Sequence, residues 1–124
     1  MKRVVLVVDD SADYRRIITR VLAAGDFRAL TAASAEDARL ILQTTPLDAV
    51  LLDWNLPGDS GIDLAREIRR DARLARLPLI MLSVNSRPQD QVQGLAEGGV
   101  NAYLTKPVNA QELLARLNAL LKIR

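Results

Sequence analysis

Short, almost uninterrupted apolar runs alternate along the chain with stretches whose apolar residues recur at helical spacing. The clearest runs are residues 4–8, 49–52 and 79–82, and weaker ones lie at 29–32 and 102–105. Apolar runs of this length are typical of strands covered on both faces of a parallel sheet. Because helical stretches separate the runs, the pattern predicts an α/β fold with five strands and five helices.

The predicted helices each begin at a recognisable start signal. Ser, Asp and Asn side chains accept hydrogen bonds from the first backbone N–H groups of a helix, and proline fits the first turn. The start signals are Ser11, Ser34, Asp59 or Ser60, Pro88, and Asn109. Glu112 follows Asn109 by three residues, in the spacing of a capping box.

The chain has the size and continuity of one domain. Its 124 residues contain no repeat, low-complexity segment or linker, so we expect a single domain over 1–124. The opening MKRVVLVVDD has five apolar residues in succession and then two acids, which fits neither a signal peptide nor a membrane span. We therefore expect a cytoplasmic location.

The composition limits the chemistry available to the chain. It has no cysteine and no histidine, which excludes thiolate metal sites, imidazole bases and a phosphohistidine of its own. The net charge is +2 and the positive residues are spread over several segments, so nucleic-acid binding is not expected. Any chemistry must use carboxylates, hydroxyls, lysine or a bound ion.

Polar residues stand at the ends of the predicted strands. They are Asp9 and Asp10, Asp53, Ser83, and Lys106. The carboxyl ends of parallel strands meet at one edge of the sheet, so these side chains are expected to converge on one pocket. Three carboxylates brought together repel one another unless a cation neutralises them, and Mg2+ prefers such oxygen ligands.

The same residues suit a phosphoryl group. An aspartate carboxylate can attack phosphorus, and Mg2+ with a lysine can offset the charge on the transferring oxygens. Asp53 is the best candidate nucleophile because it is the isolated acid at a central strand end. The adjacent pair Asp9 and Asp10 is then left for the metal.

Four motifs together resemble the receiver domain of two-component response regulators over essentially the whole chain. They are VLVVDDS, LLDWNLPG, LIMLS and NAYLTKP, in this order and at these spacings. The resemblance implies a flavodoxin-like, doubly wound sheet with strand order 2-1-3-4-5, the order of flavodoxin and the chemotaxis receiver.

The resemblance also implies a role for each matching residue. Asp53 matches the phosphoacceptor. The implied Mg2+ ligands are Asp9, Asp10, Asp53 and Asn55, the last through its backbone carbonyl. The implied phosphoryl-contacting and switch residues are Ser83, Tyr103 and Lys106. Lys106 precedes Pro107, and in this family that peptide bond is usually cis.

A phosphorelay is the function that the resemblance implies. A histidine kinase or histidine phosphotransfer protein gives a phosphoryl group to Asp53, and water later removes it. The chain is then a signalling domain with weak self-catalysed phosphotransfer and autodephosphorylation, not an enzyme. Its fourth helix, fifth strand and fifth helix form the face that a downstream protein or domain reads, with a phosphorylation-dependent homodimer as a further partner. Neither direct nucleic-acid binding nor a membrane contact is expected.

Several residues depart from the family pattern. Val84 follows the switch serine where a small residue is usual, so we expect a partly covered pocket mouth. Asn55 and Asn85 occupy positions that tune the lifetime of the phosphoryl group. The segment KPVNAQELLARLNALLKIR resembles receivers joined to winged-helix DNA-binding domains, but Asn101 and Ala102 stand where their dimer face has two acids.

Other interpretations remain open. The chain is alternatively a pseudo-receiver that only binds partners, or an aspartyl hydrolase; such phosphatases carry an acid where this chain has Asn55. Taken one at a time, these residues also have ordinary structural interpretations. Each acid fits a cap or turn residue at a strand end, Ser83 fits a polar residue at a strand end, and Tyr103 fits a packing residue with its hydroxyl at the surface. Trp54 either shields the pocket or is a surface aromatic. A basic run could dock an acidic partner, but we expect it to be a solvated helix face and loop; it comprises Arg66, Arg69, Arg70, Arg73 and Arg76.

Overall fold

The protein forms one five-stranded sheet in the order β2-β1-β3-β4-β5, in which all neighbouring strands are parallel. The computed structural model describes residues 2–85 and 87–122. The strands are β1 (Arg3–Val8), β2 (Phe27–Ala32), β3 (Ala49–Asp53), β4 (Leu79–Ser83) and β5 (Ala102–Thr105). This order, with one helix after each of the five strands, confirms the predicted flavodoxin-like α/β class.

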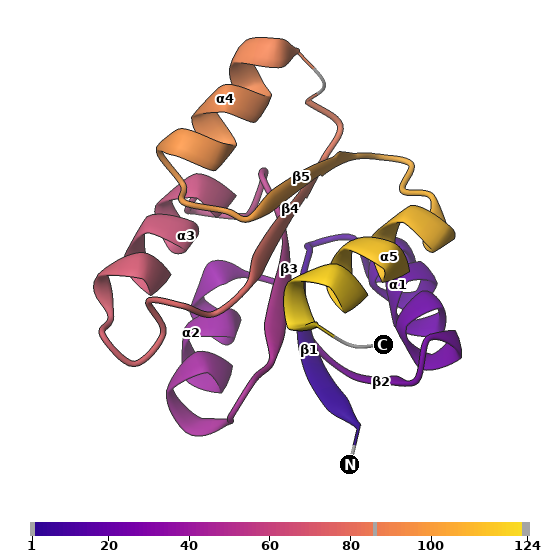
Figure 1. Cartoon of the computed structure of the whole chain (residues 1–124). Helices are drawn as coiled ribbons and strands as arrows, with labels where there is room; N and C mark the ends of the chain where they lie inside the picture. The colour runs from indigo at the N-terminus through magenta and orange to yellow at the C-terminus, as the bar shows by residue number, and fades with distance from the viewer. Residues whose placement is uncertain (1, 86, 123–124) are drawn as a thin grey trace.

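Helices cover both faces of the sheet (Figure 1). They are α1 (Ala12–Ala24), α2 (Ala35–Thr44), α3 (Gly61–Arg70), α4 (Pro88–Ala96) and α5 (Ala110–Leu121). Helices α1 and α5 lie on one face, while α2 and α3 lie on the other, with α4 beside β5. None of these helices, within the described part of the chain, is both long and apolar enough to span a bilayer.

The two helix layers explain why the central strands are continuously apolar. Alternate side chains of a strand point to opposite faces of the sheet. Leu6 and Leu52 therefore pack with α2 and α3, whereas Val7 and Leu51 pack with α1 and α5. Every residue of β3 and β4 is buried, so neither face of these strands tolerates a polar residue except at their carboxyl ends.

Side-chain caps start four of the five helices. Ser11, Ser34, Ser60 and Asn109 each accept a hydrogen bond from the backbone N–H three residues further on. Ser60 is thus the cap of α3, and the other candidate, Asp59, pairs instead with Arg39, whose Nη2 lies 2.7 Å from its Oδ2. Pro88 occupies the first turn of α4, and the Arg87 side chain before it makes no capping bond.

The basic run of α3 is not uniformly solvated, which corrects one expectation. The Arg69 guanidinium is partly buried and donates to the carbonyl of Gly99 at 2.9 Å, the carbonyl of Leu77 at 2.6 Å and Oδ1 of Asn101 at 2.9 Å. Its burial lowers the pKa of Arg69. Asn101 Oδ1 also accepts the N–H of Leu79 at 2.9 Å, so Arg69 ties α3 to the segments that lead into β4 and β5.

Candidate functional site

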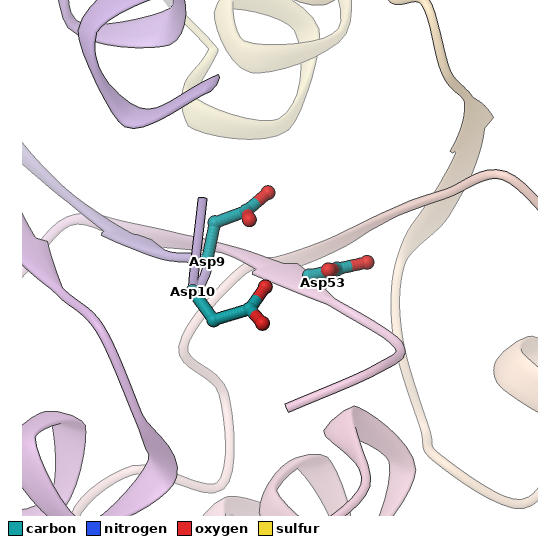
Figure 2. Close-up of side chains that lie close together, drawn as sticks. All are labelled: Asp9, Asp10 and Asp53. Carbon is teal, nitrogen blue, oxygen red and sulfur yellow. The ribbon is translucent and has the colours of Figure 1, made fainter. Parts of the chain in front are cut away.

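Three carboxylates meet where β1 and β3 end (Figure 2). Asp9 and Asp10 directly follow β1, and Asp53 is the last residue of β3. One oxygen from each side chain lies within 4.8 Å of the others. Asp9 and Asp53 are 3% and 8% exposed, whereas Asp10 is exposed to solvent. The convergence expected from the parallel strands is therefore present for all three acids.

Lys106 brings a positive charge to this cluster from the segment after β5. Its ammonium Nζ lies 2.6 Å from Asp9 Oδ2 and 3.5 Å from Asp53 Oδ2, and its side chain is 13% exposed. Burial by itself would lower the pKa of Lys106, but the hydrogen bond with Asp9 and the charges of Asp53 and Asp9 raise it overall. Lys106 is therefore a fixed ammonium group. Its peptide bond with Pro107 is cis.

The Asp53 carboxyl group is poorly solvated. Burial raises its pKa above the ordinary aspartate value, the neighbouring Asp9 raises it further, and the Lys106 charge opposes both. With all groups ionised, three carboxylates and one ammonium leave an excess of two negative charges. A buried excess charge is costly unless it is neutralised. The excess negative charge therefore favours a cation at this cluster.

The donor set fits a hard divalent ion. All three side chains offer carboxylate oxygens, and the exposed Asp10 leaves one side open to water. Mg2+ prefers oxygen ligands and keeps several of its waters. Asn55 lies two residues beyond Asp53, is exposed, and pairs with Ser60 in an isolated antiparallel bridge.

Ser83 and Tyr103 are connected through one residue, Asn85. The Ser83 hydroxyl is fully buried at the end of β4 and accepts the N–H of Asn85 at 3.0 Å. The Tyr103 hydroxyl donates to the carbonyl of Asn85 at 2.6 Å. Burial raises the pKa of Tyr103, so its phenol keeps its proton as a donor. A displacement of Ser83 would therefore act on the loop that holds Tyr103.

The Tyr103 ring lies against Trp54 and α4. The two ring centroids are 6.0 Å apart in an edge-on arrangement, and Trp54 is partly buried. A Cβ atom on Gly94 of α4 would lie 2.9 Å from Cδ2 of Tyr103, so α4 approaches the ring closely. Val84, in contrast to these packed residues, is 65% exposed.

Two residues near the site were not singled out from the sequence. Gly61 begins α3 directly against the end of β3: its N–H donates to the Trp54 carbonyl at 2.6 Å, and a Cβ there would overlap the Asp53 carbonyl oxygen. Tyr14 places its ring 4.1 Å from Lys106 Nζ. A glycine at a helix start and a tyrosine in a first turn are the only signals of these contacts that the sequence carries.

The acidic cluster fits a phosphoacceptor site on a signalling domain of this fold. A family model for the response regulator receiver domain matches residues 5–118. The chain belongs to the response regulator receiver domain family, whose members act in two-component signalling.

Known relatives agree with this assignment. The chain is 39% identical over 120 residues to the phosphate regulon transcriptional regulatory protein PhoB of Pseudomonas aeruginosa, covering 97% of this chain and 52% of that protein. It is also 39% identical over 116 residues to the chemotaxis protein CheY of the same species, covering 91% of each. The chain thus spans about half the length of the PhoB relatives and nearly all of CheY.

Solved structures show the same arrangement. The chemotaxis response regulator CheY4 of Vibrio cholerae superposes with a TM-score of 0.89 at 28% identity, covering 97% of this chain and 99% of that one. A response regulator receiver domain from Francisella superposes with a TM-score of 0.90 at 29% identity, covering 98% of both chains.

Proposed function

We propose that Asp53 accepts a phosphoryl group from a phosphohistidine on a partner protein and that the domain relays this event to an output surface. The observation that carries the proposal is the position of Asp53. It is a buried carboxylate at the end of a central strand, 3.5 Å from the fixed ammonium of Lys106 and beside the acidic pair.

The transfer is a displacement at phosphorus. An Asp53 carboxylate oxygen forms a bond to phosphorus, the phosphorus–nitrogen bond of the donor breaks, and the imidazole leaves with the electron pair. Lys106 is placed to offset the negative charge of the phosphoryl oxygens. Since these 124 residues contain no histidine, we propose that the donor histidine lies outside them, on a histidine kinase or a histidine phosphotransfer protein.

The metal ligands that we propose are Asp9, Asp10, Asp53 and the backbone carbonyl of Asn55. When bound, Mg2+ would supply positive charge to the phosphoryl oxygens and offset the excess negative charge of the cluster. In the dephosphorylation step, a water oxygen attacks phosphorus and the bond between phosphorus and the Asp53 oxygen breaks. The carboxylate is regenerated, inorganic phosphate leaves with the water oxygen and one of its protons, and the other proton passes to solvent. We propose that this hydrolysis is slow and self-catalysed.

The output step would use the connected residues Ser83, Asn85 and Tyr103. The new group adds roughly −1.5 to −2 charge, by analogy with phosphorylated hydroxyls, and several acceptor oxygens. The Ser83 hydroxyl would turn toward it and give up the N–H of Asn85, whose carbonyl holds Tyr103. Because Tyr103 packs against α4, the change would reach the face formed by α4, β5 and α5.

This face would contact a downstream protein, an attached output domain or a second copy of the chain. PhoB is named a transcriptional regulatory protein, and the matched half of it corresponds to this domain. We propose no direct contact of this domain with nucleic acid or membrane. The Asn101 amide oxygen is already used by Arg69 and the Leu79 N–H, which argues against a charge-paired dimer through that position.

Intact-mass spectrometry after incubation with acetyl phosphate and Mg2+ tests the proposal. We expect one labile phosphoryl adduct on the parent protein, none on Asp53→Ala, and none when a chelator is present. Asp63→Ala, which removes an exposed acid of α3, is the matched control and should be labelled like the parent. Absence of an adduct, together with no Mg2+-dependent change in Trp54 fluorescence, would favour a pure binding module. Sustained turnover of phosphate esters would favour a hydrolase.

A further inference from the structure

The Lys106 ammonium has a third neighbour besides the two carboxylates. Its Nζ lies 4.1 Å from the centroid of the Tyr14 ring, while Asp9 Oδ2 and Asp53 Oδ2 lie at 2.6 and 3.5 Å. A cation within about 6 Å of a ring centroid and over its face is attracted by the negative charge of that face. The neutral Tyr14 ring therefore attracts the Lys106 ammonium through a cation–π contact. The other partners of the ammonium are the two carboxylates that take part in the proposed chemistry.

Tyr14 is itself fixed at both ends. Its backbone N–H donates to the Ser11 hydroxyl at 3.2 Å, which places it in the first turn of α1, directly after the acidic pair. Its hydroxyl accepts the N–H of Val108 at 3.1 Å, two residues beyond Lys106. Tyr14 thus joins the segment that follows β1 to the segment that follows β5, although these are 94 residues apart in the chain.

The contact between the Tyr14 ring and Lys106 is important because the hydrogen-bond partners of Lys106 change during the proposed reaction. When Asp53 carries a phosphoryl group or Asp9 shares a metal ion, the lysine must turn its hydrogen bonds to new oxygens without leaving the pocket. A ring attracts a cation without requiring a particular N–H direction. Tyr14 can therefore keep the ammonium in place while its hydrogen-bond partners change.

We infer that Tyr14 is a positioning residue for Lys106, holding its ammonium through the ring face and the following backbone, at Val108, through the hydroxyl, and that it sets the rate of phosphoryl transfer to Asp53. The inference rests on the proposed function. The ring contributes the larger effect on rate, since it touches the ammonium itself, whereas the hydroxyl acts through Val108.

The first test compares Tyr14→Leu, Tyr14→Phe and the parent in the rate of adduct formation with acetyl phosphate and Mg2+. Tyr14→Leu should be slower by about 3- to 30-fold, the range expected from losing a cation–π contact. Tyr14→Phe keeps the ring and should restore most of the rate. Ile17→Ala, on the exposed side of the same helix, is the control and should match the parent.

A second test separates ring charge from ring shape. Phenylalanine, 4-fluorophenylalanine and 3,4,5-trifluorophenylalanine at position 14 have similar shapes, but fluorine withdraws charge from the ring face. The rate should fall stepwise with added fluorine, while the melting temperature and Mg2+ affinity stay constant. In a Lys106→Met background, Tyr14→Leu should cause no further loss of rate.

The outcomes distinguish the inference from the function on which it rests. A parent protein that forms no adduct overturns the proposed function and this inference with it. A labelled parent with equal rates for Tyr14→Leu, or with no dependence on fluorination, overturns the positioning role alone. A loss of rate in Tyr14→Leu that persists unchanged in the Lys106→Met background also overturns it.

Discussion

Arg69 is predicted to contribute strongly to stability although it lies at the end of the sheet away from the carboxylates. Its guanidinium donates at 3.0 Å or less to three acceptors: the carbonyls of Gly99 and Leu77 and the amide oxygen of Asn101. These acceptors come from the loops before β4 and β5. Truncation of Arg69 would remove these three hydrogen bonds between α3 and the two loops.

The expected magnitude follows from these three bonds. A hydrogen bond contributes about 1 kcal/mol net, and somewhat more when the donor is charged. We therefore expect Arg69→Ala to lower the free energy of unfolding by about 3 kcal/mol, and the melting temperature of a domain of this size by about 9–15 °C. Arg69→Lys should recover only part of the loss, because one ammonium cannot reach all three acceptors in the geometry of a planar guanidinium.

Urea denaturation followed by Trp54 fluorescence measures the effect, since Trp54 is the only tryptophan. Arg70→Ala is the matched control: this neighbouring arginine is exposed and makes no hydrogen bond or ion pair with the described residues, so its loss should change stability by less than about 0.5 kcal/mol. If Arg69→Ala and Arg70→Ala unfold at the same urea concentration, the interpretation of Arg69 as a clamp is wrong.

Two further predictions concern the site itself. Gly61→Ala should destabilise the protein by about 1–3 kcal/mol and slow labelling of Asp53, because the new Cβ would overlap the Asp53 carbonyl oxygen and only backbone movement relieves this overlap. Gly58→Ala is the control, because a Cβ there meets open space; it should carry only the cost of placing alanine at a φ of 81°. If Gly61→Ala is labelled at the parent rate, the packing argument is wrong. Asp53→Asn should be more stable than the parent at neutral pH in the absence of divalent ions, as measured by urea denaturation across pH. Burial raises the folded-state pKa of Asp53, so stability is lost as pH rises from the unfolded value of about 3.9 through the folded pKa. The advantage of the variant should therefore shrink as the pH falls toward about 4, and added Mg2+ should reduce it at neutral pH. An advantage that is constant with pH would contradict this cause.

The elements that sequence predicted well are those whose signals are local. Continuous apolar runs predicted the central strands because both faces of β3 and β4 are buried. The same parallel arrangement explains why Asp9, Asp53 and Lys106 could be expected to meet: strand order brings their ends to one edge, without knowledge of any side-chain contact.

The features that the sequence did not predict depend on contacts between segments that are distant in the chain. The sequence does not distinguish Arg69 from its solvated neighbours. Helical periodicity predicts which face of the helix a residue lies on, but it does not predict that loops distant in the sequence place the Gly99 and Leu77 carbonyls beside that residue. Tyr14 meets Lys106 across the sheet edge, and nothing in its local sequence indicates this partner. Asp59 and Ser60 were equal candidates for the α3 cap until the ion pair of Asp59 with Arg39 distinguished them.

The most direct test of the central claim is to locate the phosphoryl group. Borohydride reduces an acyl phosphate to an alcohol and so converts a phosphorylated aspartate to homoserine, which tandem mass spectrometry of peptides can place. After incubation with acetyl phosphate and Mg2+, we predict homoserine at position 53 of the parent and none in a sample treated with a chelator. Homoserine at position 9 or 10, or at no position in a protein that is folded and binds Mg2+, would contradict the assignment of Asp53 as the phosphoacceptor.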